Sequence, residues 1–232
     1  PLKSPLVQGG TLFSSNVAPQ RGMKNSSSGD MNRHLVELEP LQAITAFILA
    51  GGRSQRMGTD KAFLSYHNEP LIRGPIRTCQ SVTTDVRIIG DPARYACFGL
   101  PVIPDSGESL GPLSGIHTAL QHAPARFSSV MACDMPLMPP AFFRLMLLKL
   151  PGPDAVVMRF DDGAVEPLCA IYSLTCLPVT EQNLVNGKLK ITDLLSQVNV
   201  EYITEKELHE QGMSRKIFTN VNTPDDLRQL EL

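Results

Sequence analysis

From Ile44 onward, short apolar runs alternate with stretches of helical periodicity, and this alternation is the strongest constraint on the fold. Strands joined through helices need crossover connections, which produce a mainly parallel sheet with helices on both faces. Strands are expected at 44–49, 85–89, 102–103, 129–132, 155–158 and 168–172. Helices are expected at 72–81, 113–122, 140–150, 176–185 and 191–197. The sequence therefore predicts one α/β domain over residues 41–232.

The two ends of the sequence carry opposite signals. Near the C-terminal end, Thr223 is a typical N-cap residue, Pro224 suits the first helical position, and Asp226 faces the positive end of the helix dipole. We therefore expect a last helix that begins at Pro224. Residues 1–40 instead combine glycine pairs, serine runs and scattered prolines with low hydrophobicity. This composition is typical of a disordered tail, so residues 1–40 are expected to lie outside the domain.

Composition argues against several classes of protein. The net charge is −2, so no overall field favours nucleic acid or an anionic membrane. The apolar runs are far shorter than the roughly 20 residues of a membrane-spanning helix, and no basic-then-apolar secretory segment opens the chain. The five cysteines form no CxxC pair, and their odd number fits a reducing compartment. We expect a cytoplasmic protein without nucleic-acid or membrane partners.

The most informative segment directly follows the first predicted strand. It reads Leu49-Ala50-Gly51-Gly52-Arg53-Ser54-Gln55-Arg56-Met57-Gly58-Thr59-Asp60-Lys61. In open α/β sheets, ligands bind beyond the carboxyl ends of the strands, where this segment must lie. Its glycines let backbone N–H groups approach a ligand, and Arg53, Arg56 and Lys61 supply positive charge, which together suit a polyphosphate. The spacing is neither that of a Walker loop nor G-x-G-x-x-G, and a solvated Gly-rich turn is the alternative.

Two later loops carry further candidate residues. Asp134 follows the apolar strand that ends at Ala132, and a carboxylate at such a place suits a hard cation that keeps its waters, such as Mg²⁺. A turn-forming or capping Asp is the alternative at this position. Gly111 precedes Pro112 at the start of a predicted helix, whose free N–H groups and positive dipole end suit an anion. The alternative there is an ordinary helix that starts with proline.

The motif L-A-G-G-x-S-x-R-M-G-x-D-K resembles the signature of the molybdenum cofactor guanylyltransferase (MobA) family. Similarity extends to residues 102–106, 111–116, 133–136 and 220–224, in the order in which that family has them. The resemblance implies a single-domain, Rossmann-like nucleotidyltransferase fold. It also implies transfer of GMP from GTP to the phosphate of molybdopterin, with Mg²⁺ as cofactor and pyrophosphate as by-product. Molybdenum-insertion proteins and molybdoenzyme chaperones are the protein partners that such an activity implies.

The resemblance also assigns residues to the site. It implies that the nucleotide contacts Leu49, Ala50, Gly51, Gly52, Lys61, Asp105 and Asp134. Catalytic roles fall to Lys61, Arg56 and Asp134, with Asp134 as the metal ligand. The acceptor side is expected to include Gly111, Gly115, Lys188, Asn220 and Asn222.

The sequence departs from the family pattern near two of these regions. Gly90 stands where family members often have Asn, so a side-chain contact is expected to be lost there. Lys188 and Lys190 replace an arginine-rich stretch, and lysine cannot clamp a phosphate with two parallel hydrogen bonds as arginine does.

Two other functions remain as alternatives. One is a cytidylyltransferase for the same pterin or for another phosphorylated small molecule; the Gly51-Gly52 pair favours the GTP-using branch by resemblance. The other is a nucleotide-binding protein without turnover, against which the presence of both Lys61 and Asp134 argues.

Overall fold

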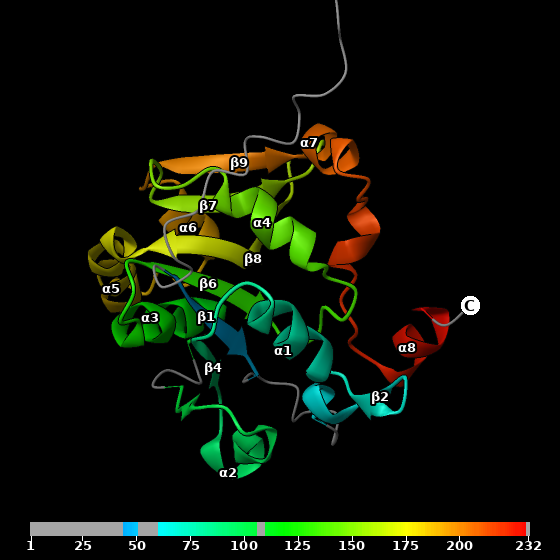
Figure 1. Ribbon diagram of the computed structural model, residues 1–232. Helices are drawn as coiled ribbons and strands as arrows, with labels where there is room; N and C mark the ends of the chain where they lie inside the picture. Colours follow the sequence, from blue (N-terminus) through cyan, green and yellow to red (C-terminus); the bar gives the residue numbers. More distant parts are fainter. Residues whose placement is uncertain (1–43, 51–59, 106–109, 231–232) are drawn as a thin grey trace, which may run out of the picture. The chain divides into compact units, whose positions relative to one another are not determined.

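The computed structural model describes residues 44–50, 60–105 and 110–230 (Figure 1). The predicted tail at 1–40 and the predicted site residues Gly51, Gly52 and Arg56 therefore lie outside the described residues. Within the described ranges, no helix is long and apolar enough to cross a membrane.

A seven-stranded sheet has the order β5-β4-β1-β6-β8-β7-β9. The strands are β1 (Ile44–Leu49), β4 (Val86–Ile89), β5 (Val102–Ile103), β6 (Phe127–Ala132), β7 (Ala155–Arg159), β8 (Val165–Ser173) and β9 (Val200–Thr204). β1 pairs in parallel with β4 and β6, and β7 pairs in parallel with β9. β8 runs antiparallel to both β6 and β7. The prediction of a mainly parallel sheet is confirmed, with β8 as an antiparallel insertion that the sequence did not reveal.

Helices cover both faces of the sheet, as predicted. They are α1 (Arg73–Gln80), α2 (Pro92–Tyr95), α3 (Pro112–His122), α4 (Pro140–Leu147), α5 (Leu177–Val185), α6 (Ile191–Leu195), α7 (Glu205–Glu210) and α8 (Pro224–Leu230). Successive side chains of a strand point to opposite faces. Accordingly, Ile48 of β1 belongs to one core with Phe142 of α4, and Phe47 belongs to the other with Ile116 of α3 and Leu194 of α6.

The order of the strands defines where the chain changes direction across the sheet. After β1 the chain adds β4 and then β5 on one side, and it returns to place β6 on the other side of β1 (Figure 1). Leu49 at the end of β1 lies opposite Ala132 at the end of β6. Such a switch point, at the carboxyl ends of parallel strands, is where open α/β sheets bind ligands.

A small hairpin, which the sequence analysis did not predict, follows a turn of 3₁₀ helix, η3 (Lys61–Phe63). Its strands are β2 (Ser65–Tyr66) and β3 (Glu69–Pro70), and they pair antiparallel. The turn residues His67 and Asn68 have φ angles of 49° and 63°, which is the geometry that tight hairpin turns require.

The predicted last helix, α8, begins at Pro224 as expected, and it packs on this hairpin (Figure 1). Leu71 after the hairpin, Val221 before α8 and Leu227 within it form a third, separate apolar cluster. Thr223 Oγ1 accepts a hydrogen bond from the Asp226 N–H at 3.2 Å, which confirms Thr223 as the N-cap. The cluster therefore fixes the segment before α8 against the chain that follows Lys61.

Candidate active site

Three side chains from distant parts of the sequence meet beyond the ends of β1 and β6. Lys61 Nζ lies 3.4 Å from Asp134 Oδ2 and donates a hydrogen bond to Asn222 Oδ1 at 2.5 Å. Lys61 is the first residue of η3, and Asp134 lies shortly after β6. The switch point between β1 and β6 therefore brings a cation, a carboxylate and an amide together.

Backbone contacts hold Asn222 in this group. The Val221 N–H donates to the Asp134 carbonyl oxygen at 2.8 Å, which joins the C-terminal segment to the loop after β6. One carboxylate oxygen of Asp226, in the first turn of α8, accepts from the N–H groups of Asn222 and Thr223 at 2.7 and 2.8 Å. The amide of Asn222 is thus positioned from both sides, by β6 and by α8.

The ion pair of Lys61 and Asp134 is less exposed to solvent than an ion pair on the protein surface. The side chains of Lys61 and Asp134 are 23% and 18% exposed. Burial raises the pKa of Asp134 above its ordinary value, although the charge and hydrogen bond of Lys61 act in the opposite direction. The effect of burial on the pKa therefore outweighs that of the lysine, and a further positive charge near Asp134 would stabilise its ionised form.

A second carboxylate, which the sequence analysis did not single out, lies near Asp134. Glu166 is close to the start of β8, the antiparallel neighbour of β6, so it lies at the edge where β6 ends. Burial raises the pKa of Glu166, and the negative charge of Asp134 adds to the rise. The end of β6 therefore carries acidic groups that water screens poorly.

Leu49 and Ala50 are held at the end of β1 by both neighbouring strands. The Ala50 N–H donates to the Ile89 carbonyl oxygen at 2.9 Å, and the Cys133 N–H donates to the Leu49 carbonyl oxygen at 3.1 Å. A Cβ atom at Gly115 would lie 3.0 Å from Leu49 Cδ1. Gly115 thus allows α3 to pack closely against the end of β1, which gives this predicted acceptor residue a packing role.

Gly111 caps the N-terminus of α3 with a backbone that favours glycine. Its φ angle is 79°, and its carbonyl oxygen accepts hydrogen bonds from the N–H and Oγ of Ser114 at 3.1 and 2.7 Å. A residue with a side chain would be strained at this φ. The helix start that the sequence predicted is therefore present.

The remaining predicted site residues lie further from the lysine. Asp105 is half-buried just beyond β5, the edge strand next to β4, and Asn220 is exposed two positions before Asn222. Lys188 is exposed in the turn between α5 and α6, where its N–H donates to the Asn183 carbonyl oxygen at 2.8 Å. Among the described residues, no hydrogen bond or ion pair joins the side chains of Lys188 or Asn220 to Lys61 or Asp134.

Asp60 and Tyr95 also border the site, although the sequence analysis gave neither of them a role. Asp60 Oδ1 accepts from the Ala62 N–H at 3.1 Å and so caps the turn that carries Lys61. Asp60 Oδ2 accepts from the Tyr95 hydroxyl at 2.8 Å and lies 3.5 Å from Arg94 Nη1. An Asp before a helical turn is a readable cap signal. The contact with Tyr95 has no local signal, because it spans 35 positions of the chain.

The donor atoms around Lys61 suit a hard divalent cation better than a soft one. Within the described ranges, no group of three or more His, Cys, Asp or Glu side chains could hold a metal ion. Mg²⁺ commonly uses one or two carboxylates and takes its other oxygens from water and substrate phosphates. A desolvated carboxylate at Asp134, with an amide oxygen from Asn222 nearby, is compatible with that kind of site.

A mainly parallel sheet covered on both faces, with a lysine–carboxylate pair at its switch point, is the architecture of an α/β protein that binds its ligand at the carboxyl ends of the strands. The sequence profile of the MobA-like NTP transferase domain matches residues 46–220. The chain belongs to this family, and it is therefore a nucleotidyltransferase.

Individual relatives agree with the family assignment. The probable molybdenum cofactor guanylyltransferase of Pelotomaculum thermopropionicum is 40% identical over 188 residues, covering 81% of this chain and 91% of the relative. The protein of the same description from Carboxydothermus hydrogenoformans is 35% identical over 190 residues, covering 82% and 96%. The crystal structure of molybdopterin-guanine dinucleotide biosynthesis protein A from Archaeoglobus fulgidus is similar with a TM-score of 0.69 at 26% identity, covering 81% and 96%.

Proposed function

We propose that this nucleotidyltransferase transfers GMP from GTP to the terminal phosphate of molybdopterin, giving the guanine dinucleotide form of the cofactor and pyrophosphate. The names of the relatives support these substrates, because the similarity to this chain covers 91% to 96% of the length of those proteins. The observation that carries the proposal is the contact of Lys61 with Asp134 and Asn222 at the switch point between β1 and β6. A lysine and an amide there can bind a triphosphate while the carboxylate binds its metal.

The reaction needs little covalent chemistry from the protein. An oxygen of the acceptor phosphate forms a bond to the α-phosphorus of GTP, and the bond from that phosphorus to the β-phosphate oxygen breaks. A phosphate monoester has a second pKa of about 6, so near neutral pH the attacking group is already largely a dianion and needs no general base. The obstacle is repulsion between two polyanions. Lys61 would lower that repulsion by neutralising charge on the nucleotide and holding its phosphates in place.

Mg²⁺ is the cofactor that fits the proposed site. Asp134 would hold it, with Asn222 close enough to contribute an amide oxygen. When bound, the ion supplies positive charge that stabilises the triphosphate and the leaving pyrophosphate. Lys61 lies against one oxygen of Asp134, and from this position its ammonium would also bind the phosphates of the nucleotide.

The other assigned residues complete the proposal. Gly51, Gly52 and Arg56 would contact the nucleotide together with Leu49, Ala50 and Asp105, and Gly111, Gly115, Lys188 and Asn220 would face the acceptor. The exposed ammonium of Lys188 would then act at long range on the acceptor phosphate. The cysteines Cys79, Cys97, Cys133, Cys169 and Cys176 are all free, which supports a reducing cytoplasmic environment. Proteins that insert molybdenum or chaperone molybdoenzymes are the partners we expect.

The decisive experiment measures pyrophosphate release with molybdopterin, Mg²⁺ and each of GTP, CTP, UTP and ATP in turn. We expect release with GTP that depends on the pterin and on Mg²⁺. The same nucleotides are compared in a thermal-shift assay, where a ligand at 100 times its Kd stabilises the fold by about 2.7 kcal/mol. Faster release with CTP would instead support a cytidylyltransferase. A GTP shift without release under any condition would support a binding protein.

A further inference from the structure

Gly90, one of the residues that depart from the family pattern, lies against the ring of Tyr95. A Cβ atom at Gly90 would come within 2.6 Å of Tyr95 Cε2 and 2.8 Å of Tyr95 Cδ2, closer than real contacts allow. The φ angle of Gly90 lies outside the left-handed region, so its backbone does not require glycine. Gly90 is needed because the ring of Tyr95 occupies the space of a side chain. The structure thus gives position 90 a steric role that the sequence analysis did not predict.

The Tyr95 hydroxyl lies between two backbone segments of the site. It contacts the Ala50 carbonyl oxygen, at the end of β1, and Asp60 Oδ2 at 2.8 Å. Asp60 in turn caps η3 through Ala62, and Lys61 is the first residue of η3. One hydroxyl thus connects the end of the central strand to the turn that carries the lysine.

The surroundings of Tyr95 keep this hydroxyl protonated and in place. The side chain is 3% exposed, and burial raises the pKa of the hydroxyl above its ordinary value, with the Asp60 hydrogen bond adding to the rise. The ring stacks on Phe63, the last residue of η3, with centroids 5.9 Å apart and an interplanar angle of 12°. Tyr95 therefore contacts η3 at Asp60 with its hydroxyl and at Phe63 with its ring.

We infer that Tyr95 is a positioning residue for Lys61, and that glycine at position 90 leaves the room that the tyrosine ring occupies. Tyr95 fixes the distance between Ala50 and η3, so Lys61 Nζ stays against Asp134 and Asn222. This inference rests on the proposed role of Lys61 in holding the nucleotide phosphates. It predicts that removing the Tyr95 hydroxyl lowers kcat/KM for GTP more than removing a buried hydroxyl elsewhere in the fold does.

The first test is Tyr95→Phe, which keeps the ring packing and removes the hydroxyl. We expect kcat/KM for GTP to fall about tenfold, the size expected for one well-placed hydrogen bond, with KM for molybdopterin unchanged. Thr83→Val is the matched control. Thr83 is also 3% exposed, and its hydroxyl donates to the Ile44 carbonyl oxygen at the other end of β1. The control should lower the melting temperature by a similar amount and leave kcat/KM for GTP unchanged.

The second test is Gly90→Ala, which displaces the tyrosine ring from the other side. It should reproduce the kinetic loss of Tyr95→Phe, and the double variant should be no slower than the slower single variant, because both changes remove the same connection. Wild-type kcat/KM for GTP in Tyr95→Phe, or an equal loss in Thr83→Val, would overturn the inference. Lys61→Ala distinguishes a failure of the proposed active site from a failure of this inference. Full activity in Lys61→Ala would contradict the proposed site. A hundredfold loss in Lys61→Ala, together with normal activity in Tyr95→Phe, would contradict only the role of Tyr95.

Discussion

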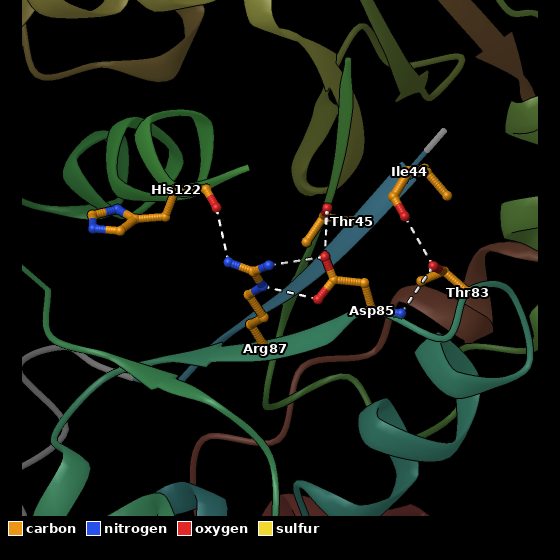
Figure 2. Close-up of polar contacts among 6 residues, drawn as sticks. All are labelled: Ile44, Thr45, Thr83, Asp85, Arg87 and His122. Carbon is orange, nitrogen blue, oxygen red and sulfur yellow. Dashed lines mark hydrogen bonds and ion pairs between the residues drawn. The ribbon is translucent and has the colours of Figure 1, made fainter. Parts of the chain in front are cut away.

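The amino ends and the carboxyl ends of the central strands, here called the amino edge and the carboxyl edge, each carry a cation paired with an aspartate. The two pairs differ in how many hydrogen bonds their charged groups make within the fold. At the amino edge, Arg87 Nε and Nη2 donate to the two carboxylate oxygens of Asp85 at 2.8 and 3.1 Å (Figure 2). Arg87 Nη1 donates to the carbonyl oxygen of His122 at the end of α3, at 2.9 Å, and the Thr45 hydroxyl donates to Asp85 Oδ2 at 3.0 Å. This group ties β1, β4 and α3 together.

At the carboxyl edge, Lys61 meets Asp134 through one contact of 3.4 Å, and burial raises the pKa of that aspartate. The amino-edge pair has the two parallel hydrogen bonds that arginine can make, so its charges are matched within the fold. The carboxyl-edge pair leaves a desolvated carboxylate that a ligand cation can stabilise further. Carboxylates whose pKa is shifted by burial beside a charged partner are concentrated at functional sites. From this comparison we expect the ion pair with more hydrogen bonds, Arg87 with Asp85, to stabilise the fold, and the pair of Lys61 with Asp134 to serve the ligand.

The largest expected difference is in how a substitution at each edge changes the rate of pyrophosphate release. Asp134→Asn keeps the shape of the side chain and removes its charge, so pyrophosphate release at saturating GTP and Mg²⁺ should fall by about 10²-fold or more. The melting temperature of the ligand-free protein should stay the same or rise, because a poorly solvated charge is lost. Near-normal release in this variant would remove Asp134 from the active site.

The same substitution at the other edge should have the opposite profile. Asp85→Asn replaces one of the oxygens that receive Arg87, so the free energy of unfolding should fall by about 1 kcal/mol, the modest value reflecting partial exposure of the pair. Turnover should remain at the wild-type level. Chemical denaturation and a pyrophosphate assay on the same preparation measure both. A loss of turnover with unchanged stability would mean that the two edges do not divide their roles as described.

A smaller effect is expected in the pH dependence of stability. The ordinary pKa of Asp134 is 3.8, and its folded value is higher. Below 3.8 the carboxyl is protonated in both states; as pH rises, the unfolded chain loses the proton first, so ligand-free stability declines until the folded carboxyl has ionised. Subtracting the Asp134→Asn melting curve from the wild-type curve at each pH isolates this contribution. A difference that grows in favour of the wild type with rising pH would contradict the raised pKa.

The smallest effect concerns residues 1–40, on which neither edge is expected to depend. Their composition gives them too little apolar surface to form a core. A chain that begins at Leu41 should therefore keep the melting temperature of the full chain and its rate of pyrophosphate release. A drop in the rate alone would connect the tail to the carboxyl edge, and a drop in the melting temperature alone would connect it to the packing of the domain.

The sequence was sufficient for the features that depend on local periodicity. The helices 113–122 and 140–150 were placed within a few residues because an apolar face repeats along each of them. The strands 44–49 and 155–158 were placed because each is a short, continuous apolar run, which is typical of a strand buried on both faces. β9 was missed, although α7 directly after it has a readable signal. The Thr204 hydroxyl accepts from the Glu207 N–H, and the Glu207 carboxylate accepts from the Thr204 N–H. The direction of β8 could not be read, since a strand's own pattern does not fix its orientation.

The site, too, contains residues that the sequence could predict and residues that it could not. Lys61 and Asp134 could be named because each follows a predicted strand, where α/β sheets bind ligands. Asn222 was assigned to the acceptor side, and the structure places its side chain on Lys61. Tyr95 carried no signal at all, because its contacts with Ala50 and Asp60 exist only after β4 and α2 have packed beside β1.

The late position of Asn222 in the chain has a consequence for how the protein is made. Synthesis proceeds from the N-terminus, so every strand of the sheet leaves the ribosome before Asn222 and α8 do. The third apolar cluster, which attaches α8 to the β2–β3 hairpin, is separate from the two main cores. The sheet can therefore fold on the nascent chain with Lys61 facing Asp134 alone. Translation has to pass α8 before the amide joins them, so chains that stop earlier would lack the contact of Asn222 with Lys61.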